Sequence, residues 1–258
     1  MDKIQAAFQK KKAFIAYLMA GDPDLDTSAQ YILAAQEAGA DLIEIGIPFS
    51  DPIAEGPVIQ QASLRALSAG ARLDKVLEMV ASLKGKMRIP LVFMTYLNPV
   101  FVYGYDRFFE ACSRIGISGI IIPDLPLEHK REVSQSAGEH GVAVISLVAP
   151  TSAERIGSIA KEAEGFLYLV SSMGVTGVRK KVGADIDARV QELRRVTAIP
   201  IAAGFGIATP EQAAQYAKHA DGVIVGSAIV SLIAKHGANA HMPLKAYIGE
   251  MKKSILNL

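Results

Sequence analysis

Short apolar runs rich in β-branched and aromatic residues recur eight times along the chain, with longer amphipathic stretches between them. The runs are continuously apolar instead of alternating, which is typical of strands that are buried on both faces of a sheet. They predict strands over residues 14–21, 42–49, 90–96, 119–125, 142–150, 166–172, 199–206 and 222–228.

The intervening stretches have helix-forming composition and predict helices that include residues 27–40, 73–84, 105–116, 128–141, 152–165 and 209–220. Hydroxyl side chains suited to cap the first turn of a helix predict N-caps at Thr27, Thr151 and Thr209. Glycines suited to a left-handed backbone predict C-terminal caps at Gly39, Gly116, Gly141 and Gly165.

A regular alternation of strand and helix predicts a parallel sheet. Eight such units in 258 residues fit a closed (β/α)₈ TIM barrel better than an open doubly wound sheet, although periodicity alone leaves the open sheet as an alternative. Because no stretch resembles a linker, we expect residues 1–258 to form a single domain. In such a barrel the chemistry belongs at the carboxyl ends of the strands.

The composition favours a small-molecule partner. With 27 basic and 26 acidic side chains and a net charge of +1, the chain offers no electrostatic basis for binding nucleic acid or an anionic membrane. No apolar stretch is long enough for a signal peptide or a membrane span, and Cys112 is the sole cysteine, so we expect a soluble cytoplasmic protein. Five dispersed histidines show no metal-ligand spacing, which predicts no metal site.

The last two predicted strands end in glycines that precede a helix, in "GFGIATPEQ" and "VGSAIVSLI". Bare backbone N–H groups at a helix N-terminus can surround an anion, and this fold commonly binds phosphate there. Gly206, Gly226 and Ser227 are therefore candidate phosphate ligands. The loop after the sixth strand, "SSMGVTGVRKKVGA", adds Thr176 and Gly177 to the candidate phosphate ligands. This loop is long enough to form a lid over the site.

Glu44 stands in the middle of the apolar run at 42–49. Leu42, Glu44 and Gly46 share one face of a strand, and the branched residues at 43, 45 and 47 share the other. The branched face should meet the helices, which places Glu44 inside the barrel near its mouth. With no Lys or Arg on neighbouring strands, burial should raise its pKa toward neutrality, as a general acid/base requires.

The motif "IEIGIPFSDPIAEGPVIQ" closely resembles the signature of the tryptophan synthase alpha subunit family. "YLMAGDPD", "PLVFMTYLNPVFVYG", "GIIIPDLP", "LYLVSSMGVTG", "GFGIATPEQ" and "GVIVGSAIV" follow in the family's order along essentially the whole chain. The resemblance implies a barrel without a cofactor of its own that cleaves indole-3-glycerol phosphate by a retro-aldol step into indole and glyceraldehyde 3-phosphate. It also implies a partner, the beta subunit of an alpha2-beta2 tetramer, to which indole is passed.

The resemblance assigns roles to single residues. Glu44 matches the acid/base that protonates C3 of the indole, and Tyr168 matches a tyrosine of the indole pocket. Glu55 matches the second catalytic carboxylate, which steadies positive charge on the indole nitrogen. The substrate-binding positions that it implies are Tyr17, Thr176, Gly177, Phe205, Gly206, Gly226 and Ser227.

Two features depart from the family pattern. Position 55 is normally Asp, so Glu55 stands one methylene further from its backbone, and Ser172 with Met173 replace a common Arg-Ser. A displacement of about 1 Å can cost about a hundredfold in rate. A weakly active subunit that mainly activates its beta partner is therefore an alternative. A different phosphate-binding barrel of the same pathway would need a catalytic Lys at a strand end, which the predicted strands lack.

Overall fold

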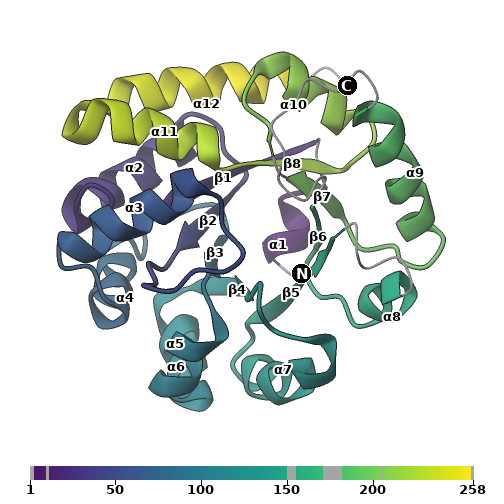
Figure 1. The fold of residues 1–258 in the computed structure, drawn as a ribbon, viewed down its shortest axis with the longest axis horizontal. Coiled ribbons are helices and arrows are strands. Elements are labelled where there is room, and N and C mark those ends of the chain that lie inside the picture. The colour runs from purple at the N-terminus through teal and green to yellow at the C-terminus, as the bar shows by residue number, and fades with distance from the viewer. Residues whose placement is uncertain (1–2, 10–11, 150–154, 171–181, 205, 257–258) are drawn as a thin grey trace.

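The eight strands close into a parallel barrel in chain order, and β8 pairs with β1 to complete the ring (Figure 1). The computed structural model describes residues 3–9, 12–149, 155–170, 182–204 and 206–256. The predicted (β/α)₈ TIM barrel is thereby confirmed, and the open sheet is excluded. Helices surround the ring on its outside (Figure 1).

The strands are β1 (Ala13–Met19), β2 (Leu42–Gly46), β3 (Leu91–Met94), β4 (Ile117–Ile121), β5 (Ala143–Val148), β6 (Leu167–Val170), β7 (Ile201–Gly204) and β8 (Gly222–Val225). Most of them end before the predicted boundary, since the chain leaves the ladder to build loops at the carboxyl ends. In β2 the ladder stops at Gly46, two residues before Pro48, which has no N–H to donate.

The helices are α1 (Lys3–Ala6), α2 (Leu25–Glu37), α3 (Pro57–Ser68), α4 (Leu73–Ser82), α5 (Leu97–Tyr103), α6 (Tyr105–Ile115), α7 (Lys130–Glu139), α8 (Ile156–Lys161), α9 (Val182–Arg194), α10 (Pro210–Ala217), α11 (Ser227–His236) and α12 (His241–Ile255). Two short 3₁₀ helices, η1 (Leu127–His129) and η3 (Gly237–Asn239), complete the elements. The helices α1, α3, α5, α9, α11 and α12 are absent from the predictions named above.

The helix caps agree with the sequence analysis in part. Thr209 caps α10 in a capping box with Gln212, and Gly116 ends α6 with the predicted left-handed backbone. The prediction for Thr27 is wrong: α2 begins at Leu25, and its N-cap is Asp24, three residues before Thr27. The Asp24 carboxylate accepts from the backbone N–H of Thr27 at 2.8 Å. A carboxylate competes well with a hydroxyl for this position. The predicted cap at Thr151 lies outside the described residues.

Two apolar layers make up most of the core, and a third cluster includes Tyr17 and Met19 of β1. The larger layer lies between the strands and the helices and contains Ile43 and Ile45 of β2. The smaller layer fills the barrel and contains Leu42 of the same strand. It also contains Ile4 of α1, which is fully buried, so the N-terminal helix helps to fill the barrel. The predicted division of β2 into an inner and an outer face is confirmed.

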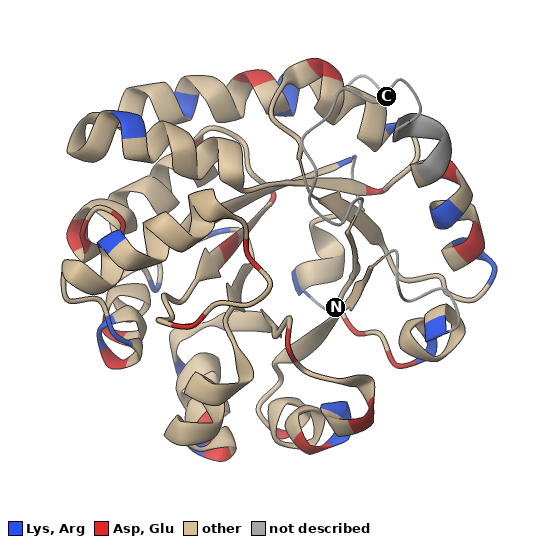
Figure 2. Cartoon of the chain, in the orientation of Figure 1, with Lys and Arg blue, Asp and Glu red and all other residues tan. Residues whose placement is uncertain are grey.

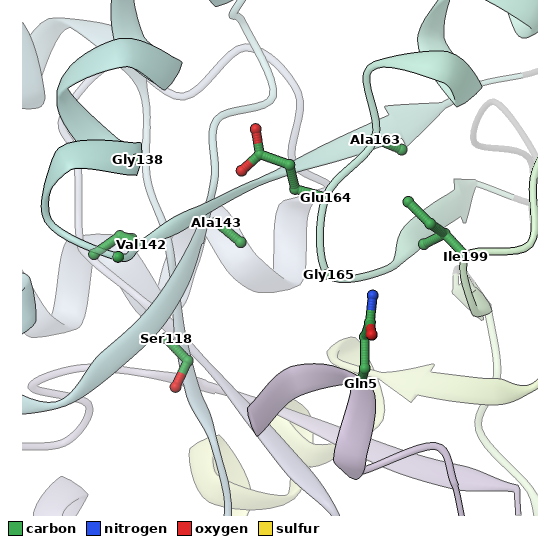
Figure 3. A pocket seen from close by; sticks show the side chains of 10 residues that line it. Gln5, Ser118, Gly138, Val142, Ala143, Ala163, Glu164, Gly165 and Ile199 are labelled. Carbon is green, nitrogen blue, oxygen red and sulfur yellow. The ribbon is translucent and has the colours of Figure 1, made fainter. Parts of the chain in front are cut away.

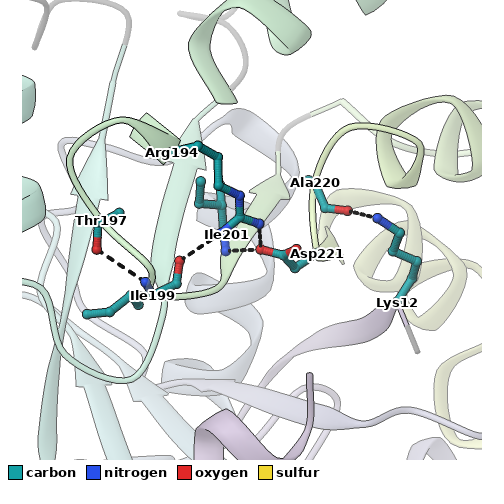
Figure 4. A network of polar contacts seen from close by, with 7 residues as sticks. All are labelled: Lys12, Arg194, Thr197, Ile199, Ile201, Ala220 and Asp221. Atoms are coloured by element: carbon teal, nitrogen blue, oxygen red, sulfur yellow. Dashed lines mark hydrogen bonds and ion pairs between the residues drawn. The ribbon is translucent and has the colours of Figure 1, made fainter. Parts of the chain in front are cut away.

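Carboxylates fasten the amino ends of the strands. Asp221, just before β8, accepts from the backbone N–H of Ile201 on β7 at 2.7 Å and pairs with Arg194 of α9 (Figure 4). Asp41, just before β2, accepts from the N–H of Phe14 on β1 and from Lys252 Nζ, each at 2.6 Å. These contacts lie at the end of the barrel opposite the loops that follow the strands.

Charged residues are spread over the outer helices, and no continuous band of one sign stands out among the residues drawn in colour (Figure 2). Within the described part of the chain, no helix has both the length and the apolar character needed to cross a membrane.

Candidate active site

Glu44 lies where the sequence pattern predicts, on the inner face of β2. Its side chain is 1% exposed, and its Oε1 atom has no hydrogen-bond partner among the described residues. Burial raises the pKa of this carboxyl to about 8, and no positive charge among the described residues opposes that shift. A carboxyl with this pKa is mostly protonated at neutral pH and can both give and receive a proton.

Tyr17 of β1 is the neighbour of Glu44 in the pairing of the two strands. Its ring passes over Gly46 on β2: a Cβ atom built on Gly46 would lie 2.1 Å from the tyrosine hydroxyl. Only a residue without a side chain fits below this ring. The hydroxyl is buried without a partner among the described residues. Burial first, and then the negative charges of Glu55 and Glu44, raise the pKa of Tyr17 well above its usual value.

Glu55 lies in the loop between β2 and α3, and its backbone oxygen accepts from Gln60 Nε2 at 2.9 Å. Burial raises the pKa of its carboxyl to about 7. Glu55 follows the carboxyl end of β2, the strand that carries Glu44, and the charges of both carboxyls act on the hydroxyl of Tyr17. The structure therefore brings the two predicted catalytic carboxylates to one end of the barrel.

Tyr96, just after β3, holds this loop in place, and the sequence analysis gives it no role. Its hydroxyl accepts from the backbone N–H of Ala54 at 2.9 Å, and its ring packs against Phe49 at 5.3 Å between centroids. Ser63 of α3 adds a second fastening, since its Oγ both accepts from the N–H and donates to the carbonyl of Phe49. The sequence feature that could have identified Tyr96 is its position at the carboxyl end of the predicted strand 90–96.

Tyr168 lies on the inner face of β6, where its ring packs with the residues that fill the barrel. A Cβ atom on Gly204 of β7 would lie 2.7 Å from its hydroxyl, so a glycine again makes room for a tyrosine from the neighbouring strand. Burial, with a smaller contribution from the charge of Glu44, raises the pKa of Tyr168 well above its usual value. Tyr168 and Glu44 therefore face the same interior.

The candidate phosphate ligands lie at the ends of β7 and β8. Gly206 has a positive φ of 74°, and nothing lies within 4 Å of a Cβ atom built on it. Gly226 is the N-cap of α11, and Ser227 is the first residue of that helix and is exposed. Thr176, Gly177 and Phe205 lie outside the described residues, as do Ser172 and Met173.

Two other polar contacts fix the loops at this end of the barrel. Arg65 of α3 binds Asp22 of the β1–α2 turn with two hydrogen bonds, at 2.9 and 2.8 Å. Asp124, after β4, accepts from the backbone N–H of Leu97 at 2.9 Å. The sequence analysis did not foresee the Asp22–Arg65 pair, because the two residues lie in different loop and helix segments that only the folded barrel brings together.

The opposite end of the barrel carries a pocket of about 360 Å³ between the amino ends of β4 to β7 (Figure 3). The carboxylate in its lining, Glu164, accepts from the backbone N–H of Val144 at 3.0 Å. Because Glu164 already stabilises the fold through this bond, Glu44, whose Oε1 has no partner among the described residues, is the better candidate for chemistry.

The amino-acid sequence matches a family model described as "Tryptophan synthase alpha chain" over residues 4–255. It is 45% identical to the tryptophan synthase alpha chain of Lacticaseibacillus casei over 255 residues, covering 99% of this chain and 96% of the relative. It is 46% identical to that of Lactiplantibacillus plantarum, covering 99% and 97%. The fold matches tryptophan synthase subunit alpha from Legionella pneumophila with a TM-score of 0.91 at 37% identity, covering 100% of both chains.

Proposed function

The chain belongs to the tryptophan synthase alpha chain family, and we propose that it cleaves indole-3-glycerol phosphate into indole and glyceraldehyde 3-phosphate. It would do so as a carbon–carbon lyase in the biosynthesis of tryptophan. The relatives that carry this family name match it over nearly their full length, which favours an enzyme over a subunit that only activates a partner.

The observation that carries the proposal is the carboxyl of Glu44. It is 1% exposed, has an unpartnered oxygen and has a pKa of about 8. Retaining a buried carboxyl with an unpartnered oxygen is costly for a fold, so a role in chemistry is the better explanation. The carboxyl points into the space where strand-end loops of this fold class bind substrates.

The proposed reaction moves one proton from an oxygen to a carbon. Protonated Glu44 gives its proton to C3 of the indole, and the ring then holds a positive charge at its nitrogen. The bond between C3 and the chain breaks, its electrons neutralise the ring, and the adjacent hydroxyl becomes an aldehyde. The carboxylate of Glu44 takes the hydroxyl proton and is ready for another turnover.

Glu55 is proposed to stabilise the positive charge that forms on the indole nitrogen. Its pKa of about 7 keeps a large fraction of the carboxyl ionised at neutral pH. The contact between Tyr96 and Ala54 fixes the backbone directly before Glu55, so the position of the longer side chain is restrained at its base. Tyr17 and Tyr168 would line the ring-binding space from two sides.

The substrate phosphate is proposed to bind at Gly206, Gly226 and Ser227, with Thr176, Gly177 and Phe205 from the neighbouring loops. The open space at Gly206 and the N-terminus of the ten-residue helix α11 support this assignment, because bare backbone amides and the helix dipole attract an anion. No cofactor is needed for this chemistry.

A tryptophan synthase beta subunit is the proposed partner, in an alpha2-beta2 tetramer. The fold matches tryptophan synthase from Mycobacterium tuberculosis with a TM-score of 0.88 at 36% identity. Ile53, Phe101 and Val102, which are 80%, 65% and 75% exposed, lie near the mouth and suit a protein partner. We propose a cytoplasmic location and one domain over residues 1–258, consistent with the lone Cys112 and the pairing of β8 with β1.

The proposal is tested by incubating the purified chain with indole-3-glycerol phosphate, alone and with a beta subunit. Indole and glyceraldehyde 3-phosphate should appear in equal amounts, and the beta subunit should raise the rate. Product formation at the level of a blank without enzyme in both cases, with the beta subunit still stimulated, would support the activator instead.

A further inference from the structure

The hydroxyl of Tyr17 is a polar group that the proposed reaction leaves without a task. The side chain is 5% exposed, and the hydroxyl has no hydrogen-bond partner among the described residues. Packing against an indole ring would need only the aromatic face. A buried hydroxyl without a partner costs the fold about 1–3 kcal/mol, which a phenylalanine would avoid.

Tyr17 stands between the two ends of the candidate site. On one side is β8, where a Cβ atom built on Gly226 would lie 3.5 Å from the Cβ of Tyr17. On the other side is β2, where Tyr17 pairs with Glu44 and its hydroxyl lies above Gly46. The order around the barrel is therefore the phosphate end, the tyrosine and the acid.

The substrate has its parts in the same order: phosphate, a chain with two hydroxyls, and the indole C3. We propose that the Tyr17 hydroxyl hydrogen-bonds the substrate hydroxyl on the carbon attached to the indole ring, and so acts as a further catalytic residue. This inference rests on the proposed function and adds a contact to it. The hydroxyl leans toward β2, so it meets the chain at the carbon next to C3 instead of the one next to the phosphate.

The protonation state of the Tyr17 hydroxyl suits it to donate this hydrogen bond. Burial and the nearby carboxylates raise its pKa, so the phenol stays protonated and serves as a donor. The substrate oxygen gains negative character as Glu44 removes its proton and the carbon–carbon bond breaks. A donor that is already in place stabilises that charge most strongly in the transition state.

Tyr17→Phe tests the inference with two ligands. With indole-3-glycerol phosphate, we expect kcat/KM to fall about ten- to a hundredfold, the effect of one hydrogen bond to a partly charged atom. Indole-3-propanol phosphate has the ring and the phosphate but neither chain hydroxyl. Its dissociation constant should stay within about twofold of the parent value, which also shows that the variant folds. Tyr31→Phe, which removes a buried hydroxyl that donates to Gly237, is the control and should leave both values unchanged.

Equal weakening of both ligands would assign Tyr17 to packing and overturn the inference, as would no change with either ligand. If the variant fails to fold, the inference can be tested by measuring how the parent chain binds substrate analogues that each lack one hydroxyl. Removing the hydroxyl next to the ring should weaken binding about tenfold more than removing the other one, and equal effects would overturn the inference. A parent chain that cleaves no indole-3-glycerol phosphate would refute the proposed function itself, which is a separate outcome.

Discussion

At the scale of single residues, the site is built from groups that the fold would be more stable without. Among the described residues, Glu44 is a buried acid with no cation beside it, and Tyr17 has a buried hydroxyl with no hydrogen-bond partner. Glycines at positions 46 and 204 leave space for the tyrosine rings from neighbouring strands. Such features commonly exchange stability for activity.

Replacing Glu44 by Gln should change the pH dependence of stability. The pKa of this carboxyl is about 8 in the folded chain and 4.5 as its ordinary value. Between pH 4.5 and pH 8, Glu44 is ionised in the unfolded chain but still protonated in the folded chain. The unfolded chain therefore binds fewer protons than the folded chain, and the free energy of unfolding falls as pH rises. We expect Glu44→Gln to be more stable than the parent by about 2–5 kcal/mol at pH 8.5, and to show little of this gain at pH 5.

Urea titrations of both proteins at the two pH values measure this effect. Glu110→Gln, at an exposed position on α6, is the matched control and should leave the pH dependence unchanged. An equal stability difference at pH 5 and pH 8.5 would mean that Glu44 is not titrating in a buried environment.

Glu55→Asp should preserve or raise the rate of indole formation. The substitution keeps the charge and restores the side-chain length usual in the family. Tyr96 fixes the backbone at Ala54, so the shorter carboxylate starts from a defined position. Steady-state rates with indole-3-glycerol phosphate measure the change. A loss of about a hundredfold would show that the loop has adapted to the longer side chain.

The position of Glu44 could be predicted from the sequence because a strand has a period of two and its branched residues share one face. The spatial neighbours of the Tyr17 hydroxyl could not be predicted from the sequence. The approach of its hydroxyl to Gly46 depends on the closure of the barrel and on the pairing of β1 with β2, which no local pattern contains. The fastening of Ala54 by Tyr96 likewise depends on how two loops meet in space.

At the scale of elements, α3 links the loops of the site. It begins at Pro57, directly after the loop that carries Glu55, and its Arg65 holds the β1–α2 turn through Asp22. Asp22 is 2% exposed, and Arg65 is its ion-pair partner. The helix thereby couples the first two strand-end loops to each other.

Arg65→Ala should lower the free energy of unfolding by about 1–3 kcal/mol, because it leaves the buried carboxylate of Asp22 unpaired while Arg65 itself is partly exposed. Denaturant titration near pH 7 measures the loss. Arg72→Ala breaks the exposed pair with Asp74, where the atoms are 3.8 Å apart, and should cost about 0.5 kcal/mol or less. Equal effects of the two substitutions would contradict the structural role of the Asp22–Arg65 pair.

The sequence predicted elements best where apolar residues repeat regularly. All eight strands and the helices α4, α6 and α7 follow such patterns. The short helix α5 begins at Leu97, within a segment that contains Pro99 and is followed by Gly104, and such residues usually indicate a loop. Helix α2 begins early because Asp24 caps it, a choice between two polar residues that the pattern leaves open.

At the scale of the whole molecule, stability and chemistry occupy opposite ends of the barrel. Asp41 and Asp221 fasten the amino ends of strands, whereas the unpartnered atoms of Glu44 and Tyr17 face the carboxyl ends. This division is general for the fold, since loops after the strands can vary without disturbing the sheet.

The pH dependence of kcat/KM should be bell-shaped for the isolated chain. Glu55 must be ionised to stabilise the indole nitrogen, so activity should fall below its pKa of about 7. Glu44 must be protonated to donate its proton to C3, so activity should fall above its pKa of about 8. Rates measured from pH 5.5 to 9.5 check this. A flat profile, or an optimum below pH 6, would contradict the assigned protonation states.

The central claim is that a buried, protonated Glu44 transfers the proton that releases indole. The most direct measurement is single-turnover cleavage of indole-3-glycerol phosphate by Glu44→Gln and by the parent chain, with indole-3-propanol phosphate binding as the check on the fold. We expect indole formation to fall at least about a thousandfold, as for loss of a general acid/base, with unchanged analogue binding. Comparable turnover by the two proteins would contradict the account.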